Sequence, residues 1–197
     1  MRFAKKLLIA LGVIIVVYLL GPCPLRPVYN HALPAVPASP AALEAYVAGL
    51  EAQHKIKPDN QARIVWANDS LKQKTEYAIV YLHGFSASQE EGNPVHRDIA
   101  KKFGCNLYLA RLSQHGIDTS DALINMTADN LWETAKQAYA IGKQLGNKVI
   151  IMGTSTGGTL ALQLAAAYPE VAGLVMYSPN IAINDPNAWI LNNPWGL

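Results

Sequence analysis

Residues 153–157 read Gly-Thr-Ser-Thr-Gly and join an apolar run at 148–152 to a helix-forming stretch at 156–168. In a G-x-S-x-G pattern of this kind, the serine stands at the apex of a sharp turn from a buried strand to a helix. Glycine is needed on both sides because a side chain there would collide with neighbouring backbone. The free N–H groups at the start of the helix favour a developing negative charge beside the serine. We therefore predict Ser155 as a nucleophile and the N–H of Thr156 as a donor to an oxyanion.

A second short motif, His-Gly-Phe-Ser at residues 83–86, directly follows the apolar run Tyr77–Leu82. Sites built around a strand-to-helix serine take their second oxyanion donor from the loop after a neighbouring buried strand. The N–H of Phe85 is the candidate for that donor. His83 has two interpretations, a catalytic base or a residue that holds the loop backbone in shape, and we favour the second.

Apolar runs and turn-forming residues alternate along the rest of the chain and predict alternating strands and helices. The predicted strands are residues 62–67, 77–82, 107–110, 148–152 and 171–177. The predicted helices are residues 41–54, 93–103, 127–145 and 156–168. This order predicts an α/β fold with a mostly parallel sheet and helices on both faces.

Three further segments complete a set that fits a known family. They are Ala-Arg-Leu-Ser-Gln-His-Gly at 110–116, Trp132 in the following helix, and Gly-Leu-Val-Met-Tyr-Ser-Pro at 173–179. With the motifs at 83–85 and 153–158, the chain from about residue 77 to 180 resembles the α/β-hydrolases, and among them the monoglyceride-lipase and carboxylesterase group of serine hydrolases. Ser113-Gln114 stands where that group has proline-glycine, and Thr156 stands where it usually has methionine or glutamine.

The resemblance implies an α/β-hydrolase fold and cleavage of a carboxylic ester, such as an acylglycerol, through an acyl-enzyme on Ser155. It implies that Phe85 and Thr156 supply the oxyanion N–H groups, that His115 is structural, and that neither a cofactor nor a metal is used. The expected partner is a small acyl ester.

The acid and base of a catalytic triad are not evident in the sequence. In this fold the triad follows the chain order serine, acid, histidine, yet all five histidines precede Ser155. Of the two later acids, we interpret Glu170 as a surface residue and Asp185 as a turn residue. We expect the triad Asp and His to lie beyond Leu197, with the fold incomplete at the C-terminus and a cap beginning at about residue 180. The 197-residue chain alone is therefore expected to have little esterase activity.

The N-terminus combines the basic residues Arg2, Lys5 and Lys6 with the uncharged, apolar run Leu7–Leu20. We interpret residues 1–21 as an uncleaved signal anchor, a transmembrane helix that places the remaining chain on the non-cytoplasmic side. A cleaved signal, a lipid anchor on Cys23 and a buried core helix are the alternatives. Residues 22–40 hold many prolines and are predicted as an extended spacer, and residues 41–197 as the hydrolase domain.

Composition excludes several classes of protein. A hydrophobic fraction of 51% with only 15% charged residues excludes a disordered chain, and two cysteines exclude a disulfide scaffold. The formal charge of +2 comes from the N-terminus, so nothing indicates binding to nucleic acid. Besides an ester hydrolase, the sequence leaves open a non-catalytic, truncated hydrolase-like protein and an acyltransferase.

Overall fold

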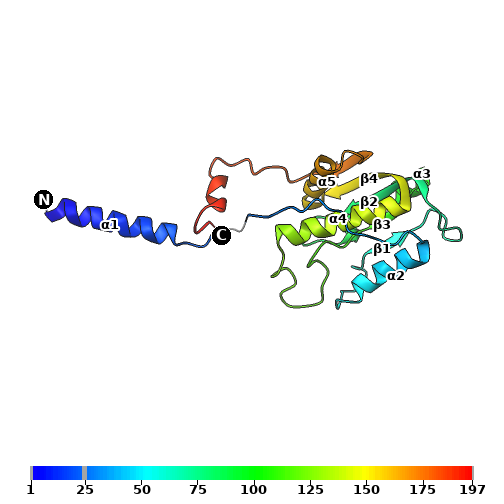
Figure 1. Cartoon of the computed structure of the whole chain (residues 1–197), viewed down its shortest axis with the longest axis horizontal. Coiled ribbons are helices and arrows are strands. Elements are labelled where there is room, and N and C mark those ends of the chain that lie inside the picture. The colour runs from blue at the N-terminus through cyan, green and yellow to red at the C-terminus, as the bar shows by residue number, and fades with distance from the viewer. Residues whose placement is uncertain (1, 24–25, 197) are drawn as a thin grey trace. The chain divides into compact units, whose positions relative to one another are not determined.

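The computed structural model describes residues 2–23 and 26–196 (Figure 1). The chain forms two compact units, one comprising Tyr29–Ile181 and the other comprising the two ends of the chain. All predicted site residues lie in the first unit.

The first unit is built on a five-stranded sheet with the order β1-β3-β2-β4-β5. Strand β1 pairs with β3 in the antiparallel direction, whereas β2, β3, β4 and β5 are parallel neighbours. The predicted, mostly parallel sheet is thus confirmed, and the motif-bearing strands β2 and β4 lie side by side in its centre. The strands are β1 (Arg63–Val65), β2 (Thr75–Leu82), β3 (Asn106–Leu109), β4 (Gly146–Thr154) and β5 (Gly173–Tyr177).

Helices cover both faces of this sheet, as predicted (Figure 1). Alternate residues of a strand point to opposite faces, and the apolar run of β2 supplies both of them. Ala78, Val80 and Leu82 pack with helices α2 (Pro40–Glu51), α4 (Ala128–Leu145) and α5 (Thr156–Ala167). Ile79 and Tyr81 pack on the other face, where α3 (Val95–Phe103) lies.

The helix boundaries follow from local chemistry. Thr127 caps α4, since its hydroxyl accepts the Asn130 N–H while the Asn130 side chain accepts the Thr127 N–H. Helix α3 ends at Gly104, which has a positive φ of 61°. Helix α4 passes directly into β4 at Gly146, where a Cβ would meet the Ala78 N–H group of β2. Strand β4 begins earlier than the apolar run at 148–152 predicts, because Gly146 already pairs with Thr75 of β2.

Part of the predicted proline-rich spacer belongs to the domain. The carbonyl of Asn30 accepts the Trp132 indole N–H at 2.8 Å, and the carbonyl of His31 accepts the Tyr168 hydroxyl at 2.9 Å. The carbonyl of Ala32 accepts a bond from the buried Lys136 ammonium at 3.0 Å. Residues 29–32 are therefore not a free spacer, because their carbonyls satisfy donors on α4 and at the end of α5. Pro24 and Leu25 of the predicted spacer lie outside the described residues.

The second unit contains helix α1 (Arg2–Leu19) and the short 3-10 helix η2 (Ala188–Asn192). Within residues 2–23 and 26–196, we find no helix whose length and apolar character would let it cross a membrane. The predicted transmembrane anchor is therefore not supported. Helix α1 includes Lys5 and Lys6, which leaves only Leu7–Leu19 uncharged, and a spanning helix needs about 20 apolar residues.

Candidate active site

Ser155 lies at the turn between β4 and α5, at the carboxyl edge of the sheet. Its φ of 50° and ψ of −113° are uncommon for a residue with a side chain and cost on the order of 1–3 kcal/mol. The surrounding backbone holds this conformation: the Ser155 N–H donates to the Tyr177 carbonyl at 2.9 Å, and the Asn180 N–H donates to the Ser155 carbonyl at 3.3 Å. The serine is thus presented at the apex of the turn, as the motif predicts.

Close backbone contacts explain the glycines of the motif. A Cβ on Gly157 would meet the carbonyl oxygen of Leu82, and one on Gly153 would lie 2.5 Å from the Gly157 carbonyl carbon. Glycine at 157 therefore lets the start of α5 lie against the end of β2. This contact brings the serine turn to the point where the loop at residues 83–86 begins.

The structure places both predicted oxyanion donors at this edge. The N–H of Thr156 opens α5, where a helix has no internal acceptor for it. In the loop, the Gly84 carbonyl accepts the His83 Nδ1–H at 2.8 Å and the Ala87 N–H at 3.3 Å. The Gly84 carbonyl and the Phe85 N–H belong to one peptide, and the C=O and N–H of a peptide point in opposite directions. The Phe85 N–H therefore points away from His83 and Ala87. Within residues 2–23 and 26–196, neither the Phe85 N–H nor the Thr156 N–H is paired with an acceptor.

Gly84 also brings the loop close to the nucleophile. A Cβ built on Gly84 would lie 3.4 Å from the Cβ of Ser155. The three residues that the sequence singled out, Ser155, Thr156 and Phe85, thus come from two segments that meet at adjacent strands. Their catalytic roles remain predictions.

His83 is structural, as we predicted. Its Nδ1–H donates to the Gly84 carbonyl and its Nε2 accepts the Leu112 N–H at 3.1 Å. Burial lowers the pKa of the fully buried imidazole to about 4, so the ring is neutral near pH 7. Both ring nitrogens are occupied, and neither is free to take a proton from a serine.

A family comparison settles the class of this fold. The description of the family model that matches residues 77–195 is "alpha/beta hydrolase fold". The chain belongs to this α/β-hydrolase family.

The chain is also similar to two proteins that are described as lipolytic enzymes. The thermostable monoacylglycerol lipase of Bacillus sp. (strain H-257) is 30% identical over 109 residues, which cover 55% of this chain and 42% of that lipase. A solved structure described with the metagenome-derived lipolytic enzymes LipS and LipT shares the fold, with a TM-score of 0.59 and 20% identity. That likeness covers 69% of this chain and 52% of the solved one. The chain thus spans about half the length of the relatives that it matches.

His115, the histidine of the 110–116 segment, packs beside the loop at residues 83–87, which carries the predicted Phe85 donor. Its ring centre lies 4.9 Å from that of His83 and 6.1 Å from that of Phe85. Its Nδ1–H donates to the Ser113 carbonyl at 2.8 Å, and its buried Nε2 has no hydrogen-bond partner among the described residues. Burial lowers the pKa of His115, so this ring too is held in its neutral form.

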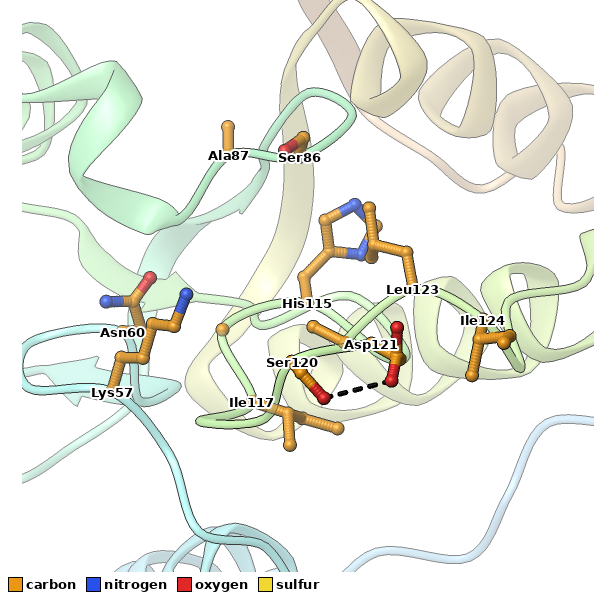
Figure 2. A pocket seen from close by; sticks show the side chains of 12 residues that line it. Lys57, Asn60, Ser86, Ala87, His115, Ile117, Ser120, Asp121, Leu123 and Ile124 are labelled. Carbon is orange, nitrogen blue, oxygen red and sulfur yellow. Dashed lines mark hydrogen bonds between the residues drawn. The ribbon is translucent and has the colours of Figure 1, made fainter.

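A cavity of about 420 Å³ opens between His115 and the loop that follows it (Figure 2). Ser86 and Ala87, which follow Phe85 in its loop, line one side. The other side carries Ser120 and Asp121, whose side chains share a hydrogen bond of 2.9 Å. The cavity therefore places both hydroxyl and carboxylate groups next to the loop that bears Phe85.

Two carboxylates of this α/β-hydrolase site were not predicted from the sequence. Glu51 of α2 forms a partly buried, two-pronged ion pair with Arg111, with N–O distances of 2.8 Å and 3.1 Å. Glu91 accepts the Gly84 N–H at 2.7 Å. Neither belongs to a motif, and the only signal for Glu91 is that it follows the carboxyl end of a buried strand, where sites of α/β folds lie. Over residues 2–23 and 26–196, we find no cluster of three or more His, Cys, Asp or Glu that could hold a metal ion.

The buried His83 predicts a loss of stability in acid. The unfolded chain binds a proton at the ordinary pKa of 6.5, whereas folded His83 binds it only at about 4. The contribution of His83 to the free energy of unfolding is therefore fully present above about pH 6.5. It is lost as the pH falls towards 4, and the loss is on the order of 3 kcal/mol. Urea unfolding at several pH values should show this decline, and His83→Gln should flatten it. His54→Gln, at an exposed position, should leave the pH dependence unchanged; an equal slope in the His83 variant would contradict the assignment.

Proposed function

We propose that the protein is a serine hydrolase that cleaves carboxylic esters through an acyl-enzyme on Ser155. The observation that carries this proposal is the strained serine turn, which adjoins a loop whose Phe85 N–H, like that of Thr156, is free to bind a developing oxyanion. Backbone donors fixed before the reaction stabilise such a charge at no reorganisation cost.

In the proposed reaction, the Ser155 oxygen forms a bond to the carbonyl carbon of the ester while its proton passes to a general base. The carbonyl oxygen becomes an oxyanion that accepts the N–H groups of Thr156 and Phe85. Its collapse breaks the carbon–oxygen bond and releases the alcohol, which takes up the proton. Water then attacks the acyl-enzyme by the same steps and frees the carboxylic acid.

The general base in this proposal is a histidine, the usual base for a serine nucleophile. His83 does not qualify, because both of its nitrogens are engaged in holding the loop. An acylglycerol or another small acyl ester is the proposed substrate, by analogy with the relative named a monoacylglycerol lipase.

Fluorophosphonate labelling and hydrolysis of p-nitrophenyl acyl esters by the full-length gene product test the proposal. Ser155→Ala should abolish labelling and lower turnover by roughly 10³-fold or more. Ser70→Ala, an exposed serine in a turn, is the matched control and should behave as wild type. Absence of labelling in the full-length protein, or turnover that survives Ser155→Ala, would reject the proposal.

A further inference from the structure

We propose that Glu91 is a positioning residue of the oxyanion loop: its carboxylate fixes the peptide before Gly84 and ties the loop to the strand that bears the nucleophile. This inference rests on the proposed function, because it concerns how the Phe85 N–H is aimed at the reacting carbonyl.

Glu91 stands at the centre of a short hydrogen-bond chain. Its Oε2 accepts the Gly84 N–H at 2.7 Å and the Tyr81 hydroxyl at 3.3 Å. The Tyr81 hydroxyl lies 3.0 Å from the hydroxyl of Thr154, the residue before the nucleophile. Burial raises the pKa of Tyr81 to about 12, so the phenol keeps its proton and can donate it to the carboxylate. The chain therefore links the oxyanion loop to the end of β4.

The 3-10 helix η1 (Gln89–Gly92) places Glu91 beside the loop. The Ser88 hydroxyl caps it by accepting the Glu90 N–H at 3.3 Å, and the buried His96 donates its Nε2–H to the Gln89 carbonyl at 2.8 Å. A Cβ on Gly92 would lie 2.5 Å from the His96 ring and 2.6 Å from the Tyr81 ring. Glycine at 92 lets the helix lie on those two rings, which pack edge to face with centres 4.7 Å apart.

Two successive peptides of the loop are thereby held from opposite ends. Glu91 fixes the N–H of the His83–Gly84 peptide, and the His83 ring fixes the carbonyl of the Gly84–Phe85 peptide. The only torsions between the two planes are those of Gly84, a residue with wide conformational freedom. Without Glu91, the His83–Gly84 peptide can turn about Gly84, and the direction of the Phe85 N–H then depends on the Gly84 carbonyl bonds alone.

The carboxylate also lies close to the nucleophile. A Cβ built on Gly84 would be 3.0 Å from Glu91 Oε1 and 3.4 Å from the Ser155 Cβ. A negative charge at this place opposes an oxyanion, so it is the hydrogen bond and not the charge that must favour the reaction. A charged acceptor holds a backbone N–H more firmly than a neutral one, yet the amide oxygen of a glutamine can replace it.

The kinetic test compares Glu91→Ala with Glu91→Gln in the full-length protein. Loss of one oxyanion donor costs 10²–10³-fold in kcat, and a misaimed donor should cost roughly 10- to 100-fold. We expect this loss for Glu91→Ala with KM changed by less than about threefold. Glu91→Gln should retain kcat within about threefold of wild type. Glu90→Ala is the matched control, because Glu90 bonds Gln89, Asn93 and Arg97 instead of the loop, and should leave kcat unchanged.

Amide hydrogen exchange separates this inference from the proposed function, since it needs no turnover. Glu91→Ala should speed exchange at Gly84 by roughly tenfold or more, while Glu91→Gln keeps it near the wild-type rate. If Glu91→Ala speeds exchange at Gly84 but neither the wild type nor any variant shows turnover that depends on Ser155, the proposed function fails. The role of Glu91 in holding the loop is then still supported. Wild-type exchange in Glu91→Ala, or equal kinetic damage in the alanine and glutamine variants, would overturn the positioning role.

Discussion

Gly157→Ala is expected to destabilise the domain by about 3 kcal/mol or more, a large effect for one methyl group. The added Cβ would meet the carbonyl oxygen of Leu82 and lie 2.7 Å from the carbonyl oxygen of His83. Both are backbone atoms, one at the end of the central strand β2 and the other in the residue that follows it, so no side-chain rotation relieves the contact. Helix α5 must move away from β2, which separates the turn at Ser155 from the loop that bears Phe85.

Urea unfolding of the variant measures this effect, and Gly49→Ala is the matched control. Gly49 lies within α2 with nothing within 4 Å of an added Cβ, so alanine there should be neutral or slightly stabilising. Labelling of the folded Gly157 variant by a fluorophosphonate should also fall. An unfolding midpoint equal to that of the Gly49 variant would show that the helix can shift without cost.

The features that were predicted from the sequence are those with a local cause. The turn at Ser155 needs glycine at fixed positions on both sides, and the buried strands β2 and β4 are continuous apolar runs. Both features can therefore be predicted from a few neighbouring residues. The structural role of His83 also followed from its place directly after β2. The antiparallel direction of β1 was not predicted, since strand direction depends on how the connecting segment runs and not on the strand's own residues.

The features that were missed depend on contacts between distant segments. Asn30 lies 102 residues from its partner Trp132, and a proline-rich stretch is equally compatible with a free spacer and with an extended chain lying on the domain. Glu91 was missed for a related reason: its bond to Gly84 requires the turn of η1, which His96 and Gly92 impose through packing. Hydrogen bonds of this kind leave no periodic pattern in the sequence.

Arg111→Ala is expected to cost about 2–3 kcal/mol, because it leaves the partly buried Glu51 carboxylate without a countercharge. The side chains of Arg111 and Glu51 are only 8% and 13% exposed. Arg111 also donates to the His115 carbonyl at 3.2 Å, and Glu51 accepts the Ala62 N–H at 2.9 Å. The pair thus fastens α2 and the chain before β1 to the loop that bears His115.

A double variant tests more sharply whether the two charged side chains depend on each other. Replacing both residues, as in Arg111→Met with Glu51→Met, removes the two charges together and should destabilise the domain less than Arg111→Ala alone. Urea midpoints of the single and double variants measure this difference. Lys55→Ala, which breaks the exposed ion pair with Asp118, is the control and should barely move the midpoint. If Arg111→Ala unfolds at the same urea concentration as the control, water reaches Glu51 and the ion pair does not hold α2 to the loop. If the double variant is less stable than Arg111→Ala, the methionine side chains fail to fill the space, and the ion pair itself stabilises the domain.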